Sequence, residues 1–355
     1  MTDTMSRIWR VGVAGLAHWY SAFGLARALP EYPKAQLVAA AWDDPAQLAE
    51  FATAFGVDAH DTYEGLLSRA DVDIVHIAAP PSQIPDIAIR AAQAGKHLIV
   101  GKPMAMTVAE ADRMTAAIRE SGVACVAFQG LMRLRHAALK ARVDAGEFGR
   151  LALIHQTSRW SIAEDWFQSG RAGWFVDPAR VPGGAFIDEG IYWVDFFRWL
   201  AASEVVAVDA RMDNLVHTDI AVEDWGLATF TFANGIRATL EASWTINAPK
   251  ATGPSPKQNS VVRLEVVGTE GEYCDQWFRD PGRAVLSAGA DNWRFERQAE
   301  APFSRVTPFP LDHLIDCLES GRPSPAGIEE ARKSFVVAMA AYRSARDGRP
   351  VTLAW

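Results

Sequence analysis

The sequence predicts an α/β protein that begins with a doubly wound parallel sheet and continues into an α+β domain with a mainly antiparallel, open sheet. Three observations support this fold class. Short apolar runs alternate with helical segments up to about residue 128, and this pattern changes after Gly149. Apolar and polar residues then alternate with a period of two at 236–245, as in a strand with one buried face.

The length of the chain predicts two domains. With 355 residues, 49% of them hydrophobic, the chain exceeds what one core usually organises. We expect a first domain at 1–130 and a second at 131–355. The C-terminal helix is the segment that could pack back on the first domain.

The first domain is expected to alternate strands and helices. Its strands are apolar on both faces, which favours a parallel sheet covered by helices on two sides. The expected strands are 8–14, 35–41, 74–78, 97–100 and 124–128. The expected helices are 21–29, a segment ending near Phe55, 88–94 and 108–121.

The second domain is expected to be rich in strands. Asn234-Gly235 is a strong signal for a type I′ turn that joins two antiparallel strands. The expected strands are 151–159, 225–232, 236–245, 261–267, 272–277 and a short tail strand at Val351. The expected helices run from Gly183 to about Leu200, from 311 to 319 and from 327 to 346, and the proline-containing segment 247–260 is expected to be a mobile loop.

Composition excludes several classes of partner. The net charge of −8 is spread along the chain without a basic cluster, so neither nucleic acid nor an anionic membrane is expected. Cys125, Cys274 and Cys317 are far apart and lack metal-ligand spacing, so neither a disulfide framework nor a metal site is expected. With no signal-peptide pattern and no apolar run of about 18 residues, we expect a soluble, cytoplasmic protein.

A candidate cofactor site follows the first strand. Gly15-Leu16-Ala17-His18 lies where a glycine-rich dinucleotide fingerprint would lie, although Ala17 and Tyr20 occupy the later glycine positions. Asp43 ends the second strand and could bind ribose hydroxyls, which favours NAD without excluding NADP. The alternatives are a plain strand-to-helix turn at Gly15, and a turn and helix cap at Asp43 and Asp44.

A candidate catalytic lysine follows the strand at 97–100. Proline disfavours a helical conformation in the residue before it, so Lys102 of Gly101-Lys102-Pro103 should project from the carboxyl edge of the sheet. A lysine beside a cationic nicotinamide is expected to have a lowered pKa, which suits proton transfer. The alternative is a solvated lysine at the end of a strand.

The stretch from 183 to 195 combines apolar residues with three regularly spaced polar ones. If it is helical, Asp188, Tyr192 and Asp195 lie at i, i+4 and i+7 and share one face. Such a polar stripe is costly to bury without partners, so we expect it to border a cleft or to bind a ligand. A solvated surface helix is the alternative, and for Glu189 it is the preferred interpretation.

In this order and at these separations, the three sites resemble the Gfo/Idh/MocA family of NAD(P)-dependent oxidoreductases. The resemblance covers essentially the whole chain. The segments that support it are Ala94-Gly95-Lys96-His97 with Gly101-Lys102-Pro103, Gly183-Gly184 through Asp195, Val222-Glu223-Asp224, Asn234-Gly235, Ser243-Trp244, and the tail from Ala341 to Val351.

The resemblance implies a Rossmann domain and an α/β domain whose open sheet mediates a homodimer or homotetramer. A sugar, polyol or related hydroxy compound would lie against the nicotinamide in a cleft between the domains. The implied catalytic residues are Lys102, Asp188 and Tyr192. The candidate cofactor contacts are Gly15, Ala17, His18, Asp43, Ala79, Pro80 and Lys102, and the candidate substrate contacts are Lys102, Trp160, Trp174, Asp188, Tyr192 and Asp195, with Trp166 and Trp193 as further stacking candidates.

Three positions depart from the family pattern. Gly101 replaces a glutamate of the family pattern, and Tyr192 replaces a histidine. Ile84 stands near the position where the family usually has another histidine. A free phenol titrates near pH ~10, so Tyr192 would need help from Lys102 or from the charge of the cofactor to act as a base.

The leading functional hypothesis is an NAD(P)-dependent dehydrogenase or reductase that acts on a secondary hydroxyl or ketone of a carbohydrate-like compound. A second hypothesis is a redox-neutral lyase or epimerase that uses tightly bound NAD. A third is a sensor that binds dinucleotide or sugar without turnover, which the incomplete fingerprint and the missing glutamate and histidine motivate.

Overall fold

The computed structural model describes residues 7–162, 173–245, 260–277, 282–297 and 309–355. The chain folds into two compact units. Unit 1 comprises Met1–Gln129 and Pro302–Arg332, and unit 2 comprises Gly130–Ala301 and Lys333–Trp355. Residues 247–259 of the predicted mobile loop lie outside the described residues.

Unit 1 contains a parallel sheet with the strand order β3-β2-β1-β4-β5-β6. The order reverses between β1 and β4, as in dinucleotide-binding sheets, so the prediction of a doubly wound parallel sheet is confirmed. The strands are β1 (Trp9–Ala14), β2 (Ala35–Ala41), β3 (Asp58–His60), β4 (Ile74–Ile77), β5 (His97–Val100) and β6 (Cys125–Ala127).

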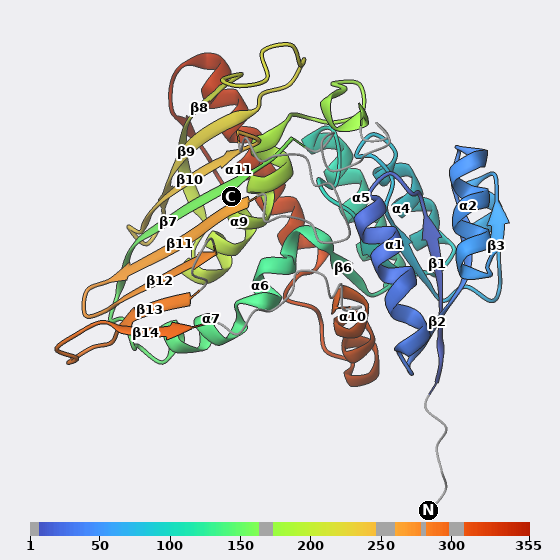
Figure 1. Ribbon diagram of the computed structural model, residues 1–355, viewed down its shortest axis with the longest axis horizontal. Coiled ribbons are helices and arrows are strands. Elements are labelled where there is room, and N and C mark those ends of the chain that lie inside the picture. Colours follow the sequence, from blue (N-terminus) through green and yellow to red (C-terminus); the bar gives the residue numbers. More distant parts are fainter. Residues whose placement is uncertain (1–6, 163–172, 246–259, 278–281, 298–308) are drawn as a thin grey trace, which may run out of the picture. The chain divides into compact units, whose positions relative to one another are not determined.

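The helices of unit 1 cover this sheet (Figure 1). They are α1 (Trp19–Ala28), α2 (Pro45–Phe55), α3 (Tyr63–Leu67), α4 (Ile84–Gln93), α5 (Val108–Ser121) and α10 (Phe309–Ser320), with short 3-10 turns at η1 (Leu29–Glu31) and η2 (Phe128–Gly130). Sequence reasoning missed β3 and α3, which are too short for a periodic pattern to develop.

Side chains cap the starts of two long helices in unit 1. The Asp44 carboxylate accepts hydrogen bonds from the backbone N–H groups of Ala46 and Gln47, so the predicted cap of α2 is confirmed. Thr107 and Glu110 form a reciprocal capping box at the start of α5. These contacts satisfy backbone donors that have no partner inside the helix.

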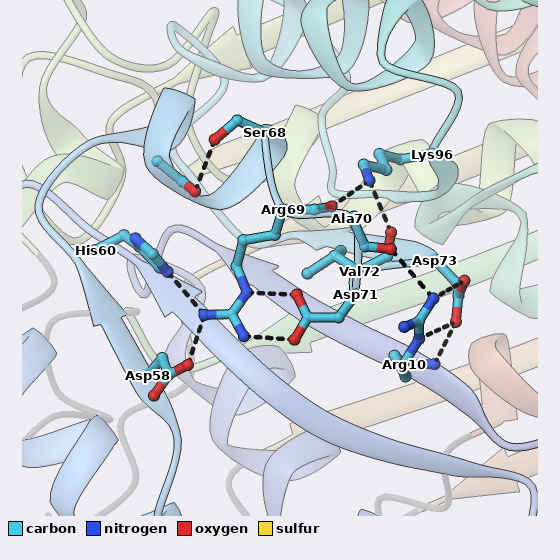
Figure 2. A network of polar contacts seen from close by, with 11 residues as sticks. Arg10, Asp58, His60, Ser68, Arg69, Ala70, Asp71, Val72, Asp73 and Lys96 are labelled. Carbon is cyan, nitrogen blue, oxygen red and sulfur yellow. Dashed lines mark hydrogen bonds and ion pairs between the residues drawn. The ribbon is translucent and has the colours of Figure 1, made fainter.

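A polar network surrounds the segment that leads into β4 (Figure 2). Arg10 of β1 donates to Asp73 from its Nε at 2.9 Å, and Arg69 forms two hydrogen bonds with Asp71, at 2.8 and 2.6 Å. Lys96 donates to the backbone carbonyls of Arg69 and Val72, at 2.6 and 2.8 Å. Lys96 therefore has a structural role, because it satisfies carbonyls that the sheet leaves unpaired.

The described strands of unit 2 form a nine-stranded sheet with the order β14-β13-β12-β11-β7-β10-β9-β8-β15. Among the described pairs, β7 and β10 are parallel and the others are antiparallel, so the predicted mainly antiparallel sheet is confirmed. The strands are β7 (Leu151–Trp160), β8 (Val205–Asp213), β9 (Trp225–Phe232), β10 (Arg237–Ser243), β11 (Ser260–Gly268), β12 (Glu272–Trp277), β13 (Gly282–Leu286), β14 (Arg294–Arg297) and β15 (Val351–Thr352).

Helix α9 packs on one face of this sheet, against β7, β9 and β10 (Figure 1). Gly190 allows the close approach, because a Cβ there would lie 3.1 Å from a methyl carbon of Leu240. The described helices of unit 2 are α6 (Leu131–Arg135), α7 (Ala137–Asp144), η3 (Gly173–Val176), α9 (Ala185–Ala201) and α11 (Ile328–Asp347), the last of which begins in unit 1. The predicted hairpin is present, with Arg237 opposite Thr231 and Gly235 at a φ of 90°, but the predicted type I′ turn was wrong. Such a turn needs a positive φ at both central residues, and Asn234 is not among the described residues with a positive φ.

Candidate active site

The turn after β1 brings three of the predicted cofactor residues together. Gly15 has a φ of 90°, and a Cβ there would lie 2.6 Å from the backbone of Ala79. The N–H of His18 donates to the carbonyl of Ala78 at 2.9 Å, which holds the turn against the end of β4. The conformation and the close approach require position 15 to lack a side chain, and the turn places a helix N-terminus at the carboxyl edge of the sheet.

Asp43, the predicted ribose contact, is exposed at the end of β2. Its carboxylate accepts a hydrogen bond from Gln83 Nε2 at 3.2 Å. Gln83 in turn accepts one from the hydroxyl of Tyr63 at 2.7 Å. The side chain of Asp43 is therefore oriented by a residue that follows β4, the strand beside the fingerprint turn.

Lys102 is buried, with 3% of its surface exposed, so it is not the solvated lysine of the alternative interpretation. It lies close enough to His18 to act on it electrostatically. Burial lowers the pKa of His18 well below its usual range, and the Lys102 ammonium lowers it further. The structure thus brings together two residues that the sequence assigned to the cofactor site.

A second buried histidine lies beneath this turn. His76 of β4 is 2% exposed, and its Nε2 lies 2.6 Å from the hydroxyl of Ser21 in the first turn of α1. Burial lowers the pKa of His76 to about 4, because the charged imidazolium would lose its hydration. His76 is accordingly neutral at physiological pH.

The low pKa of His76 predicts a loss of stability in mild acid. A histidine whose pKa falls from its ordinary 6.5 to about 4 on folding stabilises the protein above pH 6.5, and this contribution is lost between pH 6.5 and 4. Between pH 7 and pH 5, the unfolding free energy of wild type should fall by about 2 kcal/mol more than that of the variant His76→Gln, measured by urea denaturation. The variant His155→Gln, on the other sheet, serves as the control. Equal pH dependence in wild type and His76→Gln would contradict the prediction.

Two of the departures from the family pattern lie side by side. A Cβ on Gly101 would lie 2.7 Å from the carbonyl oxygen of Ile77 and 3.3 Å from the Cδ1 atom of Ile84. Any larger residue at position 101 would therefore require the backbone or Ile84 to shift. The positions of the missing glutamate and the missing histidine are therefore neighbours in the fold.

Helix α9 carries Asp188, Tyr192 and Asp195, three of the predicted site residues of unit 2. Asp188 is 4% exposed, and one of its carboxylate oxygens accepts a hydrogen bond from the indole N–H of buried Trp244 at 3.3 Å. Tyr192 is half-buried one turn later. Desolvation lowers the pKa of Arg135, and the phenol of Tyr192 opposes this effect, so the guanidinium lies within electrostatic range of the phenol.

Asp195 is 1% exposed and belongs to a buried polar network. The guanidinium of Arg133 in α6 forms two hydrogen bonds with its carboxylate, one of them 2.8 Å long, and Ser334 donates to it at 2.7 Å. Burial raises the pKa of Asp195, and the charge of Arg133 acts against this rise. These contacts join α6, α9 and α11 at one point.

Some sequence interpretations need correction or qualification. Glu189 is 7% exposed, so the interpretation of a solvated residue was wrong. It lies on a helix whose side chains are almost all buried, so little of its surface reaches solvent. Trp193 is 5% exposed and packs edge-on against His136 in the core, whereas Trp166 lies outside the described residues.

The predicted substrate contacts Trp160 and Trp174 occupy different settings. Trp160 is half-buried at the end of β7, where its indole N–H donates to Ser158 at 3.1 Å. Trp174 is 6% exposed and stacks on Phe175, with ring centroids 3.8 Å apart.

Sequence reasoning assigned no role to Glu223 and Tyr342, whose side chains hold the N-terminus of α9. The adjacent glycines Gly183 and Gly184 were a signal that something approaches closely there. The sequence did not indicate which residues do so, because Glu223 and Tyr342 are 119 positions apart. Arg133, the partner of Asp195, was missed for the same reason.

Two other kinds of site are absent from the described ranges. None of the helices there is long and apolar enough to cross a membrane. No group of three or more His, Cys, Asp or Glu side chains in the same ranges could hold a metal ion.

Two family models match the chain. The model described as "Oxidoreductase family, NAD-binding Rossmann fold" matches residues 9–129. The model described as "GFO/IDH/MocA C-terminal domain" matches residues 136–274. The two matches follow each other along the chain and together cover most of it.

Individual proteins agree with these models. The chain is 28% identical to the scyllo-inositol 2-dehydrogenase (NAD(+)) of Bacillus subtilis, over 97% of this chain and 96% of that protein. The crystal structure of an aldose-aldose oxidoreductase from Caulobacter crescentus, complexed with glycerol, covers 98% of this chain and 100% of its own, with a TM-score of 0.80 and 25% identity. A levoglucosan dehydrogenase in complex with NADH has the same fold, with a TM-score of 0.83 at 22% identity, and covers 98% of this chain and 100% of its own.

Proposed function

The chain belongs to the GFO/IDH/MocA family of oxidoreductases, and we propose that it transfers hydride between NAD and a secondary hydroxyl or ketone of a sugar or polyol. The observation that supports this most directly is the pairing of an NAD-binding Rossmann match with a relative named as an NAD(+)-dependent inositol dehydrogenase along nearly its full length. We propose that unit 1 binds the dinucleotide, while unit 2 contributes to substrate binding.

The residues of unit 1 fit a dinucleotide. Gly15 packs directly on Ala79 before the start of α1, and a pyrophosphate would bind the backbone at such a helix N-terminus. We propose contacts from Gly15, Ala17 and His18 to the pyrophosphate. Ala79 and Pro80 would lie along the cofactor, and Asp43 would hold the ribose hydroxyls. Bound NAD would accept the hydride from the carbinol carbon.

The proton of the substrate hydroxyl needs an acceptor. We propose that Lys102 and Tyr192 share this proton and that Asp188 orients the substrate by accepting hydrogen bonds from its hydroxyls. The guanidinium of Arg135 supports a role for Tyr192, because a nearby cation favours the phenolate form.

Trp160 and Trp174 are proposed to stack on apolar faces of the substrate, as tryptophans do with sugars. For Asp195, the contacts with Arg133 and Ser334 support positioning of α9 more than direct contact with substrate.

Turnover can be followed by NADH absorbance. With inositols, monosaccharides and sugar alcohols as a panel, we expect multiple-turnover reduction of NAD by at least one compound. Conversion of a substrate without net NADH, detected by mass spectrometry, would support a redox-neutral lyase or epimerase instead. Binding of NAD without conversion of any compound would support a sensor.

The assignment of Asp43 makes a prediction about cofactor choice. Loss of two charge-assisted hydrogen bonds to ribose in Asp43→Ala should weaken NAD binding about tenfold or more, with a smaller effect on NADP. Titration by tryptophan fluorescence measures both dissociation constants. The variant Asp44→Ala, which removes only the cap of α2, should affect both cofactors equally. Equal weakening of NAD and NADP in Asp43→Ala would remove Asp43 from the ribose site.

We propose that the open face of the sheet in unit 2 forms a homodimer or homotetramer. Leu153 and Leu227 are 37% and 40% exposed on the face opposite α9, where strand alternation places them. A monomeric mass in sedimentation equilibrium would contradict this proposal.

We also propose a cytoplasmic location, which the free thiols of Cys125, Cys274 and Cys317 support.

A further inference from the structure

The N-terminus of α9 is closed by two side chains from distant parts of unit 2. The first N–H groups of a helix have no partner within the helix. Here Gly184 and Phe186 donate to the two carboxylate oxygens of Glu223, at 2.9 and 3.0 Å. Ala185 donates to the backbone carbonyl of Glu223 at 2.9 Å. Ile187 donates to the hydroxyl of Tyr342 at 3.1 Å, so all four N–H groups from Gly184 to Ile187 are paired.

The residues before α9 are shaped to fit this arrangement, which we call the α9 clamp (Gly183, Gly184, Glu223 and Tyr342). A Cβ on Gly183 would lie 2.1 Å from the hydroxyl oxygen of Tyr342. A Cβ on Gly184 would lie 2.0 Å from the carbonyl oxygen of Glu223. Both distances are far shorter than any Cβ contact, so the clamp explains why both positions are glycine.

The clamp places a negative charge where a helix attracts one. The N-terminus of a helix carries a partial positive charge and free donors, and it commonly binds the carboxylate or phosphate of a ligand. The Tyr342 hydroxyl also donates to Glu223, at 2.6 Å. Burial raises the pKa of Glu223, while its hydrogen bonds oppose this rise. Because Gly184, Phe186 and Tyr342 all donate to the carboxylate, these contacts fit its ionised form.

Asp188 lies in the first turn of the same helix. It is close enough to Tyr342 for its charge to act on that phenol. A substrate held by Asp188 would therefore lie within one helical turn of the clamp. An anionic group on that substrate would find the N–H donors of α9 already paired, and the carboxylates of Asp188 and Glu223 would lie nearby. Like charges in a poorly hydrated site repel strongly.

We propose that the α9 clamp positions Asp188 and also excludes anionic substrates, so that this enzyme selects polyols without a carboxylate or phosphate beside the reacting carbinol. The proposal rests on the proposed function, in which Asp188 contacts the substrate. Glu223 and Tyr342 act through α9 and are positioning residues. Their effect on substrate choice distinguishes them from residues that only stabilise the helix.

The experiment compares a neutral substrate with its acidic counterpart, such as an aldose with the uronic acid of the same carbon skeleton. We expect a wild-type ratio of kcat/KM, neutral over acidic, of about 100 or more, and we expect Glu223→Gln to reduce that ratio about tenfold. Tyr342→Phe keeps the carboxylate charge, so it should lower kcat for both substrates and leave the ratio unchanged. An unchanged ratio in folded, active Glu223→Gln would overturn the proposal.

A second measurement uses wild-type enzyme, so it does not depend on whether a variant folds. The acidic compound should inhibit oxidation of the neutral one with an inhibition constant at least about 100-fold above the KM of the neutral compound. Comparable values would overturn the proposal. Failure of the proposed function has a different signature, because wild type would then reduce no NAD with the neutral substrate. If only the role of Asp188 is wrong, Asp188→Asn would retain the turnover of wild type.

Discussion

Replacement of Lys102 by methionine is expected to reduce kcat on the order of 10³-fold while NAD binding changes little. Methionine preserves most of the apolar stem of this 3% exposed side chain but removes the ammonium group that is proposed to share the substrate proton. Single-turnover kinetics with the substrate found in the panel would measure the loss. Titration of NAD by tryptophan fluorescence would show that the cofactor site remains intact.

Lys96→Met is the matched control for Lys102→Met. Lys96 is another nearly buried lysine of unit 1, but it donates to the backbone carbonyls of Arg69 and Val72. Its loss leaves these carbonyls unpaired, so we expect a lower melting temperature and normal kcat per folded molecule. Turnover of Lys102→Met within a factor of a few of wild type would remove Lys102 from the proposed mechanism.

The largest expected effect on stability comes from Arg133→Met. The variant leaves the carboxylate of Asp195 buried without its guanidinium partner while Ser334 still donates to it, and loss of one partner of a buried ion pair costs about 3–5 kcal/mol. Urea denaturation of the full chain, followed by tryptophan fluorescence, measures this loss. The double variant Arg133→Met/Asp195→Leu should recover most of it, because the uncompensated charge is removed as well.

A surface pair provides the control for Arg133→Met. Arg159 and Glu241 form an ion pair of 2.8 Å on neighbouring strands, but Arg159 is 45% exposed. We expect Arg159→Met to cost less than about 1 kcal/mol. Equal losses in Arg133→Met and Arg159→Met would show that burial does not govern the contribution of these pairs. A stable double variant with an unchanged KM would further show that Asp195 makes no contact with substrate.

Much of the secondary structure could be predicted because its signals are local. The bounds of β2, α5, β9 and β12 agree with the predicted segments to the residue. Asp44 was recognised as a helix cap, and Asn234-Gly235 indicated the hairpin but not its turn type. Strand β8 was missed although it has nine residues. Its burial does not alternate cleanly, so no period-two pattern marks it.

The candidate site was predictable only in part. Lys102 was identified by its place after a strand, and Asp188 by its place on an apolar helix, and their catalytic roles remain predictions. The sequence did not indicate that Ile84 lies where a side chain at position 101 would be, although both departures were visible in it. A contact between segments 17 positions apart depends on how β4, β5 and α4 pack.

The sequence by itself determined the alternation of strands and helices, the family and the class of chemistry, because these follow from local patterns and from motifs whose order can be read along the chain. Only the tertiary structure decided the partners of buried charges. It shows that Asp195 pairs with Arg133, that Glu223 and Tyr342 bind the N-terminus of α9, and that Pro302–Arg332 belongs to unit 1. A buried charge must find a partner, but any of many distant residues could supply it, and the packing of the folded chain determines which one does.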